Sequence, residues 1–507
     1  MSINELFMNI LFFSSLIFLG GIFIYWSMRG DPPVEKALQM PPLQLQPPVL
    51  PSYIKPCIFS IKDAELREEA KRDVGNAMLV LLRSSDIGLE PGFRDYMYCW
   101  LQRSIDTTRA ALVSLSLLKD GGFIKHNQDR ILNFVNRCFD EKQGGYSIVP
   151  FPTPNGKEEK VSIYGTSNAI EVIKHALGIP IKEKLINNGN TNEFLKKIIE
   201  WRDTKLNEFI RSCVELKDNI HYVYDQPGNN TTDGICVTYL LSRLFWSLNR
   251  ENKLFELIPK SEIENYIENC EKSIDVDGSA LGFAPSPSQK KPTMSATSFA
   301  LSLMGDKPYY KEEFTKLRNK FFNDEKKTKF LKFIDRCWDE QRGGYGASEG
   351  RIASTNGTYF ALRIMNLLGL KIEKDKIERI KQFVRECYCD GGGFTFSKDF
   401  SPKMPFAHGT RWVLQIDKEL SEKNEGSLTK VLSKENGGIL IKEPSKKDGG
   451  ILTNEQREET KDFLIYELYN REEGGFLGLP IPPDVRAKNC PLINKDILPL
   501  SRGGFAV

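Results

Sequence analysis

One short pattern of hydrophobic positions recurs along the chain. An aromatic residue precedes a cysteine by four positions, which places both side chains on one face of a helix, one turn apart. The cysteines of successive copies are 75, 57, 67 and 50 residues apart. Repetition on this scale predicts an array of one supersecondary unit, and function is then sought where a copy departs from the pattern. The five copies are Phe134 with Cys138, Phe209 with Cys213, Tyr266 with Cys270, Phe333 with Cys337, and Phe383 with Cys387.

Each copy continues into a turn and a second helix. Paired glycines and an aromatic follow the first helix, as at residues 343–345, and glycine readily adopts the positive φ that ends a helix. Small hydroxyl residues such as Thr166 and Ser354 then open a more apolar helix. The pattern predicts an inner layer of buried helices and an outer layer of amphipathic ones. Weaker copies near residues 92–118 and 463–476 bring the total to about six or seven hairpins.

The repeated cysteines are spread over the array, one in each hairpin, so they are expected to be buried packing residues and not a metal cluster. Their spacing does not indicate disulfides, and the ten cysteines of the chain favour a reducing environment.

The aromatic-x-x-x-Cys helix, the Gly-Gly-aromatic turn and the sequence Thr-Tyr-x-Ala-Leu together resemble the repeat of the protein prenyltransferase β subunits and the squalene cyclases. The resemblance is strongest over residues 333–370, where Thr358 and Tyr359 open the matching helix. It implies an all-α fold, a closed α/α toroid of about six or seven helical hairpins, over residues 57–480. In that family, the central cavity holds an isoprenoid chain.

The resemblance also implies a zinc site, built from Asp-x-Cys on one inner helix and histidine on another. Asp233, Cys236 and His408 lie near these positions and are the candidate metal ligands. The spacing here is Asp-x-x-Cys, and the histidine comes three repeats later, which predicts a place across the ring. The alternative is that Asp233 caps a helix and Cys236 belongs to the core. The acidic Asp-x-Asp-Asp motif of the cyclases is absent from the sequence, so the residues leave open whether the protein is an enzyme.

A second candidate site lies at the start of a late inner helix. His408, Arg411 and Trp412 form a basic and aromatic group there, and a helix N-terminus attracts anions. We predict that these residues, with Tyr359, bind a substrate such as an isoprenoid diphosphate. The alternative is that they only cap and pack the helix.

The N-terminus has a different character. Residues 6–28 carry no charge and are long enough to cross a bilayer, so residues 1–30 are expected to form one transmembrane anchor. Arg29 and Lys36 follow this segment and only Glu5 precedes it, which favours a single-pass protein with its large domain in the cytoplasm. Eight prolines make residues 31–56 an extended linker, and residues 481–507 are expected to form an extended tail.

Charge gives little indication of a macromolecular partner. The net charge is +3, from 70 basic and 67 acidic residues, so nucleic-acid binding is not expected. The first hypothesis is a membrane-anchored, prenyltransferase-like toroid that binds or transfers an isoprenoid or similar lipid in its central cavity. The second is a non-catalytic toroid that binds a lipid or a protein. A third is a carbohydrate-active barrel that uses paired carboxylates, for which Asp140 with Glu141 and Asp339 with Glu340 are candidates.

Overall fold

The computed structural model describes the larger part of the chain between residues 103 and 478. The predicted membrane anchor, the Pro-rich linker, the C-terminal tail and the weak repeat at residues 92–93 lie outside the described residues. Within the described residues, no helix combines the length and the hydrophobicity needed to cross a bilayer. All of them belong to the unit Val49–Val507. They are residues 103–150, 161–178, 198, 200–201, 204–217, 220–227, 234–275, 278–305, 314–399, 403, 405–425, 451–471 and 474–478.

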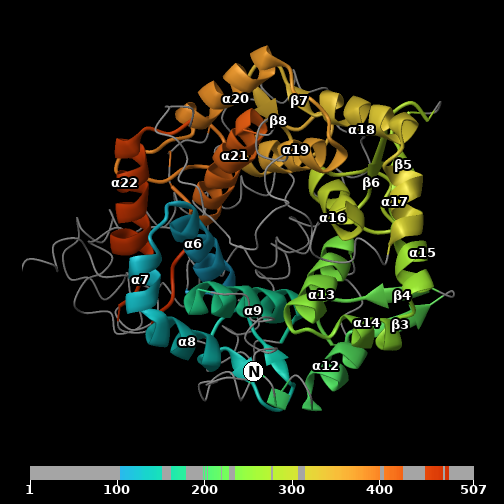
Figure 1. The fold of residues 1–507 in the computed structure, drawn as a ribbon, viewed down its shortest axis with the longest axis vertical. Helices are drawn as coiled ribbons and strands as arrows, with labels where there is room; N and C mark the ends of the chain where they lie inside the picture. Colours follow the sequence, from blue (N-terminus) through green and yellow to red (C-terminus); the bar gives the residue numbers. More distant parts are fainter. Residues whose placement is uncertain are drawn as a thin grey trace, which may run out of the picture. The chain divides into compact units, whose positions relative to one another are not determined.

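Six inner helices form a closed ring in this part of the chain. Each inner helix packs against the next one in sequence, and α21 packs against α6, so the first and the last are neighbours (Figure 1). Most of the described residues of these helices are buried. The closed toroid implied by the family resemblance is therefore confirmed. The inner helices are α6 (Ile105–Leu117), α9 (Ile163–Leu177), α13 (Ile235–Ser247), α16 (Met294–Gly305), α19 (Thr355–Leu368) and α21 (Ala407–Glu425).

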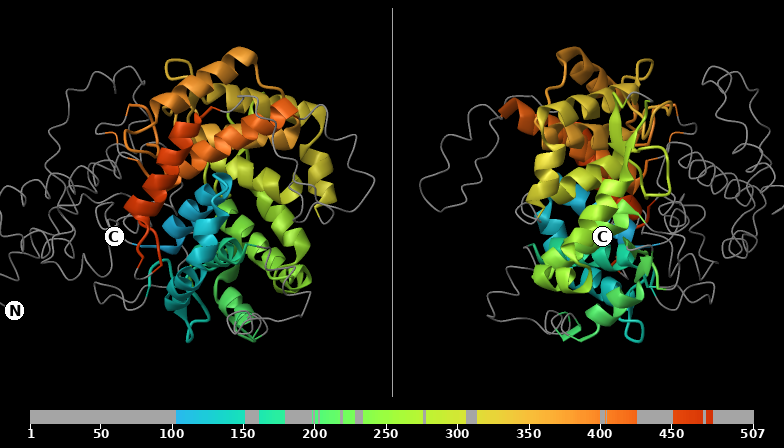
Figure 2. Two further views of the ribbon diagram at one scale, coloured as in Figure 1. Left: turned by 60° about the vertical axis from the view of Figure 1, so that its left-hand side comes forward. Right: turned by 90° about the vertical axis from the view of Figure 1, so that its right-hand side faces the viewer.

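An outer layer of helices surrounds the ring (Figures 1 and 2). Its main members are α8 (Gln128–Arg137), α12 (Leu206–Ser212), α15 (Lys260–Cys270), α18 (Asp324–Arg336), α20 (Lys374–Glu386) and α22 (Asn454–Asp462), which continues into the π-helix η2 (Phe463–Leu468). Short helices complete this layer: α7 (Gly121–His126), α14 (Glu251–Leu257) and α17 (Thr315–Phe321).

Short antiparallel hairpins join outer helices to inner helices. In each hairpin the second strand leads towards the inner helix, and the first follows the outer one. The pairs are β1 (Phe139–Asp140) with β2 (Gly145–Tyr146), β3 (Val214–Lys217) with β4 (Ile220–Val223), β5 (Glu271–Ser273) with β6 (Leu281–Phe283), and β7 (Trp338–Asp339) with β8 (Gly344–Tyr345).

A threonine stands at the fourth position of every inner helix and ties five of them to the turn of an outer helix. Its hydroxyl accepts a hydrogen bond of 2.9–3.1 Å from the backbone N–H of an aromatic residue. For Thr358 this donor is Tyr345, from the turn just before the helix. For Thr108 the donor is Phe476, near the other end of the described chain. The six threonines are Thr108, Thr166, Thr238, Thr297, Thr358 and Thr410.

A second bond joins each inner helix to the following turn. The N–H of the first residue of the helix donates to a main-chain carbonyl at 2.8–2.9 Å. The acceptor lies two residues beyond a turn position that is aromatic in five repeats and Val223 in the sixth. Ala407 makes this bond to Gly478, so the last inner helix has the same connection as the others. The ring therefore closes through the same contacts that join its interior repeats. The other five pairs are Ile105 with Ile148, Ile163 with Asp225, Ile235 with Pro285, Met294 with Ala347, and Thr355 with Phe396.

The repeated cysteines end the outer helices as buried thiols. All five are at most 2% exposed, and so are their aromatic partners four residues earlier. Burial raises the pKa of Cys213 to about 12, with the nearby carboxylate of Asp225 acting in the same direction. A thiol with such a pKa stays protonated at neutral pH, which suits a packing residue. The burial expected from the sequence is confirmed.

The turn at residues 474–478, which we call the closing turn, packs directly on α8, the first of the main outer helices. Gly474 has a φ of +84°, and a Cβ atom on it would lie 2.0 Å from the carbonyl oxygen of Arg130 in α8. Gly391 has almost the same φ, +85°, but a Cβ there would have no atom within 4 Å. The two glycines thus differ in their surroundings and not in their backbone conformation.

We predict that Gly474→Ala destabilises the protein more than Gly391→Ala. Both changes introduce the strain of a left-handed residue, about 1–2 kcal/mol. The first also forces the closing turn away from α8, which adds about 1–3 kcal/mol in the manner of an overpacked site. Urea unfolding of the full chain measures both losses. Equal losses would show that the closing turn does not rest on α8 as described.

Candidate binding site in the central cavity

The inner helices surround a cavity, and the residues that line it occupy the same positions in every helix. Counted from the first residue of a helix, they stand at the second, fifth, sixth or ninth position. These spacings fall on one helical face. The empty space between the lining residues is about 890 Å³, including space continuous with solvent. The threonine at the fourth position is constant, whereas the lining positions differ from helix to helix.

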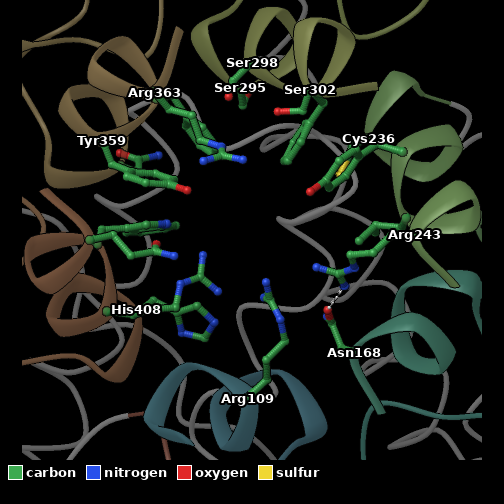
Figure 3. Close-up of a pocket in the computed structure, with 18 of the residues that line it drawn as sticks. Arg109, Asn168, Cys236, Arg243, Ser295, Ser298, Ser302, Tyr359, Arg363 and His408 are labelled. Carbon is green, nitrogen blue, oxygen red and sulfur yellow. Dashed lines mark hydrogen bonds between the residues drawn. The ribbon is translucent and has the colours of Figure 1, made fainter. Parts of the chain in front are cut away.

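Aromatic rings form the wall contributed by three neighbouring helices. Tyr239 of α13 stacks on Phe299 of α16, with 5.0 Å between the ring centroids. Phe299 in turn meets Phe360 of α19 edge-on at 5.5 Å, and Tyr359 lies beside Phe360. The hydroxyl of Tyr359 points towards the middle of the cavity (Figure 3). Such a wall offers apolar surface and a few polar groups to a ligand.

A buried acid–base pair lies between α21 and α6. The Nε2 of His408 and the Oδ2 of Asp106 are 2.8 Å apart, and Tyr164 of α9 hydrogen bonds to the same carboxylate. Burial opposes ionisation of Asp106, yet His408 and Arg109 together hold the pKa of this carboxyl well below its usual range. Burial also lowers the pKa of His408, although Asp106 acts in the opposite direction. The Nε2 of His408 is placed to donate a hydrogen bond to the carboxylate.

Two of the four cavity arginines have carboxylates of their own. Arg363 lies 3.4 Å from Glu419, near the end of α21. Arg243 donates to Ser167 and to Asn168, at 3.1 Å each. Glu171 is buried, which opposes its ionisation, but Arg243 and other cations lower its pKa to about 2. The charges of Arg243 and Arg363 are thus largely balanced within the protein.

Arg109 and Arg411 stand at the fifth positions of α6 and α21, the two helices that close the ring. Burial lowers the pKa of Arg411 to about 10, and the neighbouring Arg109 contributes to the decrease, while Asp106 opposes it. Within the described part of the chain, the Nε atoms of both arginines are buried and have no hydrogen-bond partner. Both guanidinium groups act on the carboxylate of Asp106, which is also bonded to His408, and Arg109 acts in addition on Glu171. This corner of the cavity has an excess of positive charge and of donors.

The structure brings together the four residues predicted to bind a substrate. His408, Arg411, Trp412 and Tyr359 all line the cavity. That they bind a ligand stays a prediction.

The predicted metal ligands are not brought together. Cys236 and His408 are the second residues of α13 and α21, which are three steps apart in a ring of six, and Figure 3 shows them on opposite walls. Asp233 lies outside the described residues. Among the residues that are described, no cluster of three His, Cys, Asp or Glu side chains could hold a metal ion. Cys236 lines the cavity and is 6% exposed.

The carboxylates considered for a glycosidase bond to turns or surface cations. Asp140 accepts from the backbone N–H groups of Lys142 and Gln143, and Asp339 accepts from the N–H of Arg342. Neither residue lines the described cavity. Glu340 pairs with Arg379 of the outer helix α20. These contacts are those of carboxylates that stabilise turns and pair with cations at the surface.

Three arginines of the cavity, and Asp106, were missed by the sequence analysis. In the sequence, the arginines can be identified by their spacing from the threonine at the fourth position of each inner helix. Arg109 follows Thr108 by one residue, as Arg411 follows Thr410, while Arg243 and Arg363 follow their threonines by five. An alignment of the repeats on this threonine would have found them.

Comparison with known families agrees with the geometry. Residues 54–176 and 309–458, just over half of the chain, match the family described as the prenyltransferase alpha-alpha toroid domain. The chain belongs to this family.

Comparison with individual proteins gives the following results. Among solved structures, the chain is similar to a Candida albicans protein geranylgeranyltransferase-I complexed with GGPP. The TM-score is 0.43 and the identity 14%, over 69% of this chain and 91% of that chain. A search of curated proteins found no significant match.

We predict that Asp106→Asn destabilises the protein by roughly 3 kcal/mol at pH 7, because it removes a buried charge that several cations share. The pKa of Asp106 is lowered on folding, so its contribution is complete above its unfolded value of about 3.9 and is lost as the pH falls below it. The difference between parent and variant should therefore shrink from pH 7 to pH 3. Urea unfolding at several pH values measures it.

Asp335→Asn is the control, because Asp335 is half-exposed and pairs with Lys376 at the surface. Its loss should be below about 1 kcal/mol. An Asp106→Asn variant as stable as the parent at pH 7 would contradict the central role given to this carboxylate.

Proposed function

We propose that this protein is a prenyltransferase-like toroid that binds an isoprenoid or a similar lipid with an anionic head in its central cavity. The single observation that carries the proposal is the pair of neighbouring arginines Arg109 and Arg411, which both line the cavity and whose charges act on one another. Family membership supports the same class of ligand.

The charges favour an anion at this corner. A diphosphate beside Arg109 and Arg411 would accept hydrogen bonds from donors that have no partner in the described chain. It would also relieve the repulsion that lowers the pKa of Arg411. The free energy gained is larger than at a surface, because both groups are shielded from water.

The aromatic wall supports an apolar component of the ligand. The ring of Phe299 contacts those of Tyr239 and Phe360, and two of the three helices that carry them, α13 and α16, are not ring neighbours of α6 or α21. A ligand with an anionic end and an apolar part would match this division. The proposal concerns binding, and it includes no metal-dependent transfer step, since Cys236 and His408 stand on opposite walls.

Calorimetric titration of the full chain in detergent micelles tests the proposal. Farnesyl and geranylgeranyl diphosphate are titrated with and without zinc and magnesium. We expect saturable, micromolar binding, weakened about 10- to 100-fold in Arg411→Gln, which corresponds to the loss of a hydrogen bond to a charged group. Binding that depends on zinc would indicate that the protein also catalyses prenyl transfer.

Arg336→Gln is the matched control, because Arg336 lies on the outer helix α18 and pairs with Asp275. It should bind like the parent. Absence of binding in the parent, or an equal effect of both substitutions, would refute the proposal and favour a toroid that serves as a scaffold.

We also propose that residues 6–28 anchor the protein in a membrane, with the toroid on the cytoplasmic side. The support is the uncharged length of this segment and the basic residues that follow it. We expect the full chain to resist alkaline extraction from membranes and a chain lacking residues 1–30 to be released. Protease protection of the toroid in sealed vesicles determines the side. Release of the full chain at alkaline pH would refute the anchor.

A further inference from the structure

We infer that the preferred ligand of the central cavity is a lipid whose head carries a single negative charge, a carboxylic acid, and that a diphosphate binds less tightly. The inference rests on the proposed function, since it assumes that an anionic head binds beside Arg109 and Arg411 with its hydrocarbon chain in the cavity. It goes further by naming the charge and the chemical class of the head. The balance of buried charges around the cavity carries the argument.

The cations of the cavity wall are arginines. Within the described part of the chain, four arginines and no acidic residue line the cavity. Arg109 and Arg411 occupy the fifth positions of α6 and α21, and Arg243 and Arg363 occupy the ninth positions of α13 and α19. The guanidinium groups of Arg109, Arg243 and Arg363 point into the cavity (Figure 3). Arg243 and Arg411 are at most 8% exposed, and a charge so far from water needs an opposite charge close by.

Three buried carboxylates stand behind this wall. Asp106, Glu171 and Glu419 are each at most 8% exposed. Glu419 lies 3.4 Å from Arg363. Burial raises the pKa of Glu171, but Arg243 and other cations bring it down to about 2. Asp106 interacts with Arg109 and opposes the decrease in the pKa of Arg411. All three carboxylates are therefore engaged with the arginines of the wall.

These buried side chains leave one positive charge in excess, because four arginines face three carboxylates. Lys174 also lies 3.7 Å from Glu171, but about a third of its side chain is exposed, so water screens its charge. Burial lowers the pKa of His408, so its imidazole carries no charge at about pH 8. One further anion of unit charge makes this set of buried groups neutral.

The possible heads differ in charge. At about pH 8 a carboxylic acid carries one negative charge, a phosphate monoester about two and a diphosphate about three. A carboxylate cancels the excess, whereas a diphosphate replaces it with an excess of buried negative charge, which is unfavourable in the same way. A metal ion would reduce that charge, but the described residues include no cluster that could hold one. A carboxylate is also planar and matches the fork of donors on an arginine.

The hydrocarbon chain of such an acid has an apolar surface to lie against. The ring of Phe299 contacts the rings of Tyr239 and Phe360, and Leu240 also lines the cavity. These side chains carry no charge, so burying a chain against them leaves the balance of charges as it is. The head and the chain of one ligand can therefore both be held in the cavity.

A series of lipids with one chain and different heads tests the inference. Farnesol, farnesoic acid, farnesyl phosphate and farnesyl diphosphate are titrated by calorimetry into the full chain in detergent micelles, at about pH 8 and with EDTA. The affinities are corrected for the partition of each lipid into micelles without protein. We expect farnesoic acid to bind about tenfold more tightly than farnesyl diphosphate, because only the acid leaves no unpaired buried charge.

Variants that change the buried charge should change the preferred head. Glu419→Gln and Glu171→Gln each remove a carboxylate and raise the excess to two positive charges, so the preference for the acid over the diphosphate should fall about tenfold or reverse. Two affinities are compared within one protein, so a general loss of stability does not produce this shift. Glu340→Gln is the matched control, because Glu340 pairs with Arg379 on the outer surface. It should keep the preference of the parent.

The outcomes separate the two proposals. If farnesyl phosphate or diphosphate binds in an Arg411-dependent manner and at least as tightly as farnesoic acid, the inference is overturned and the proposed function stands. An unchanged preference in folded Glu419→Gln or Glu171→Gln also overturns the inference, because buried charge would then not select the head. If no anionic lipid binds more tightly than farnesol, the proposed function fails, and the inference fails with it.

Discussion

The arrangement of this protein depends on one main-chain hydrogen bond, from the first residue of each inner helix to a carbonyl in the turn of the following repeat. The bond is repeated six times at nearly the same length, so each inner helix has the same connection to the turn that follows it. The bond from Ala407 to Gly478 belongs to this set and holds the last turn in the same position as the others. That turn then meets the first repeat, where the N–H of Phe476 donates to Thr108 of α6 and Gly474 packs on Arg130 of α8, and these contacts close the ring.

The constant contacts leave the cavity face free to vary. Every inner helix has a threonine at its fourth position, whereas its second, fifth, sixth and ninth residues differ widely in charge and size. The second residues include Asp106, Tyr164, Cys236 and His408 on one framework. The fold therefore determines where a side chain points, and the local sequence determines what it contributes. The same division explains why family membership identifies the architecture of this chain more directly than its ligand.

The array of helical hairpins was predictable from the sequence because its signals are local and repeated, whereas its closure into a toroid was implied by the family resemblance. An aromatic residue and a cysteine one turn apart, as in Phe333 and Cys337, indicate a helix with one buried face, and a Gly-Gly-aromatic turn marks its end. The site was predictable only in part. His408, Arg411 and Trp412 attracted attention because they lie together in sequence, whereas Arg109 lies some 300 residues away from them. Asp106 became recognisable as the partner of His408 only once α21 was seen to pack against α6, since no sequence spacing relates the two.

The seam between α21 and α6 brings the site and the closure together. Forming the contact between α21 and α6 requires the two ends of the toroid to meet. The residues involved are far apart in sequence, and contacts of this kind form slowly during folding. Without a ligand, closure of the ring brings Arg109 close to Arg411. The repulsion between their charges then opposes part of the favourable free energy of closure. An anion bound between the two arginines would remove this opposition. By mass action, a bound anion would then shift the equilibrium towards the closed ring, so the ligand would stabilise the fold as well as occupy the site.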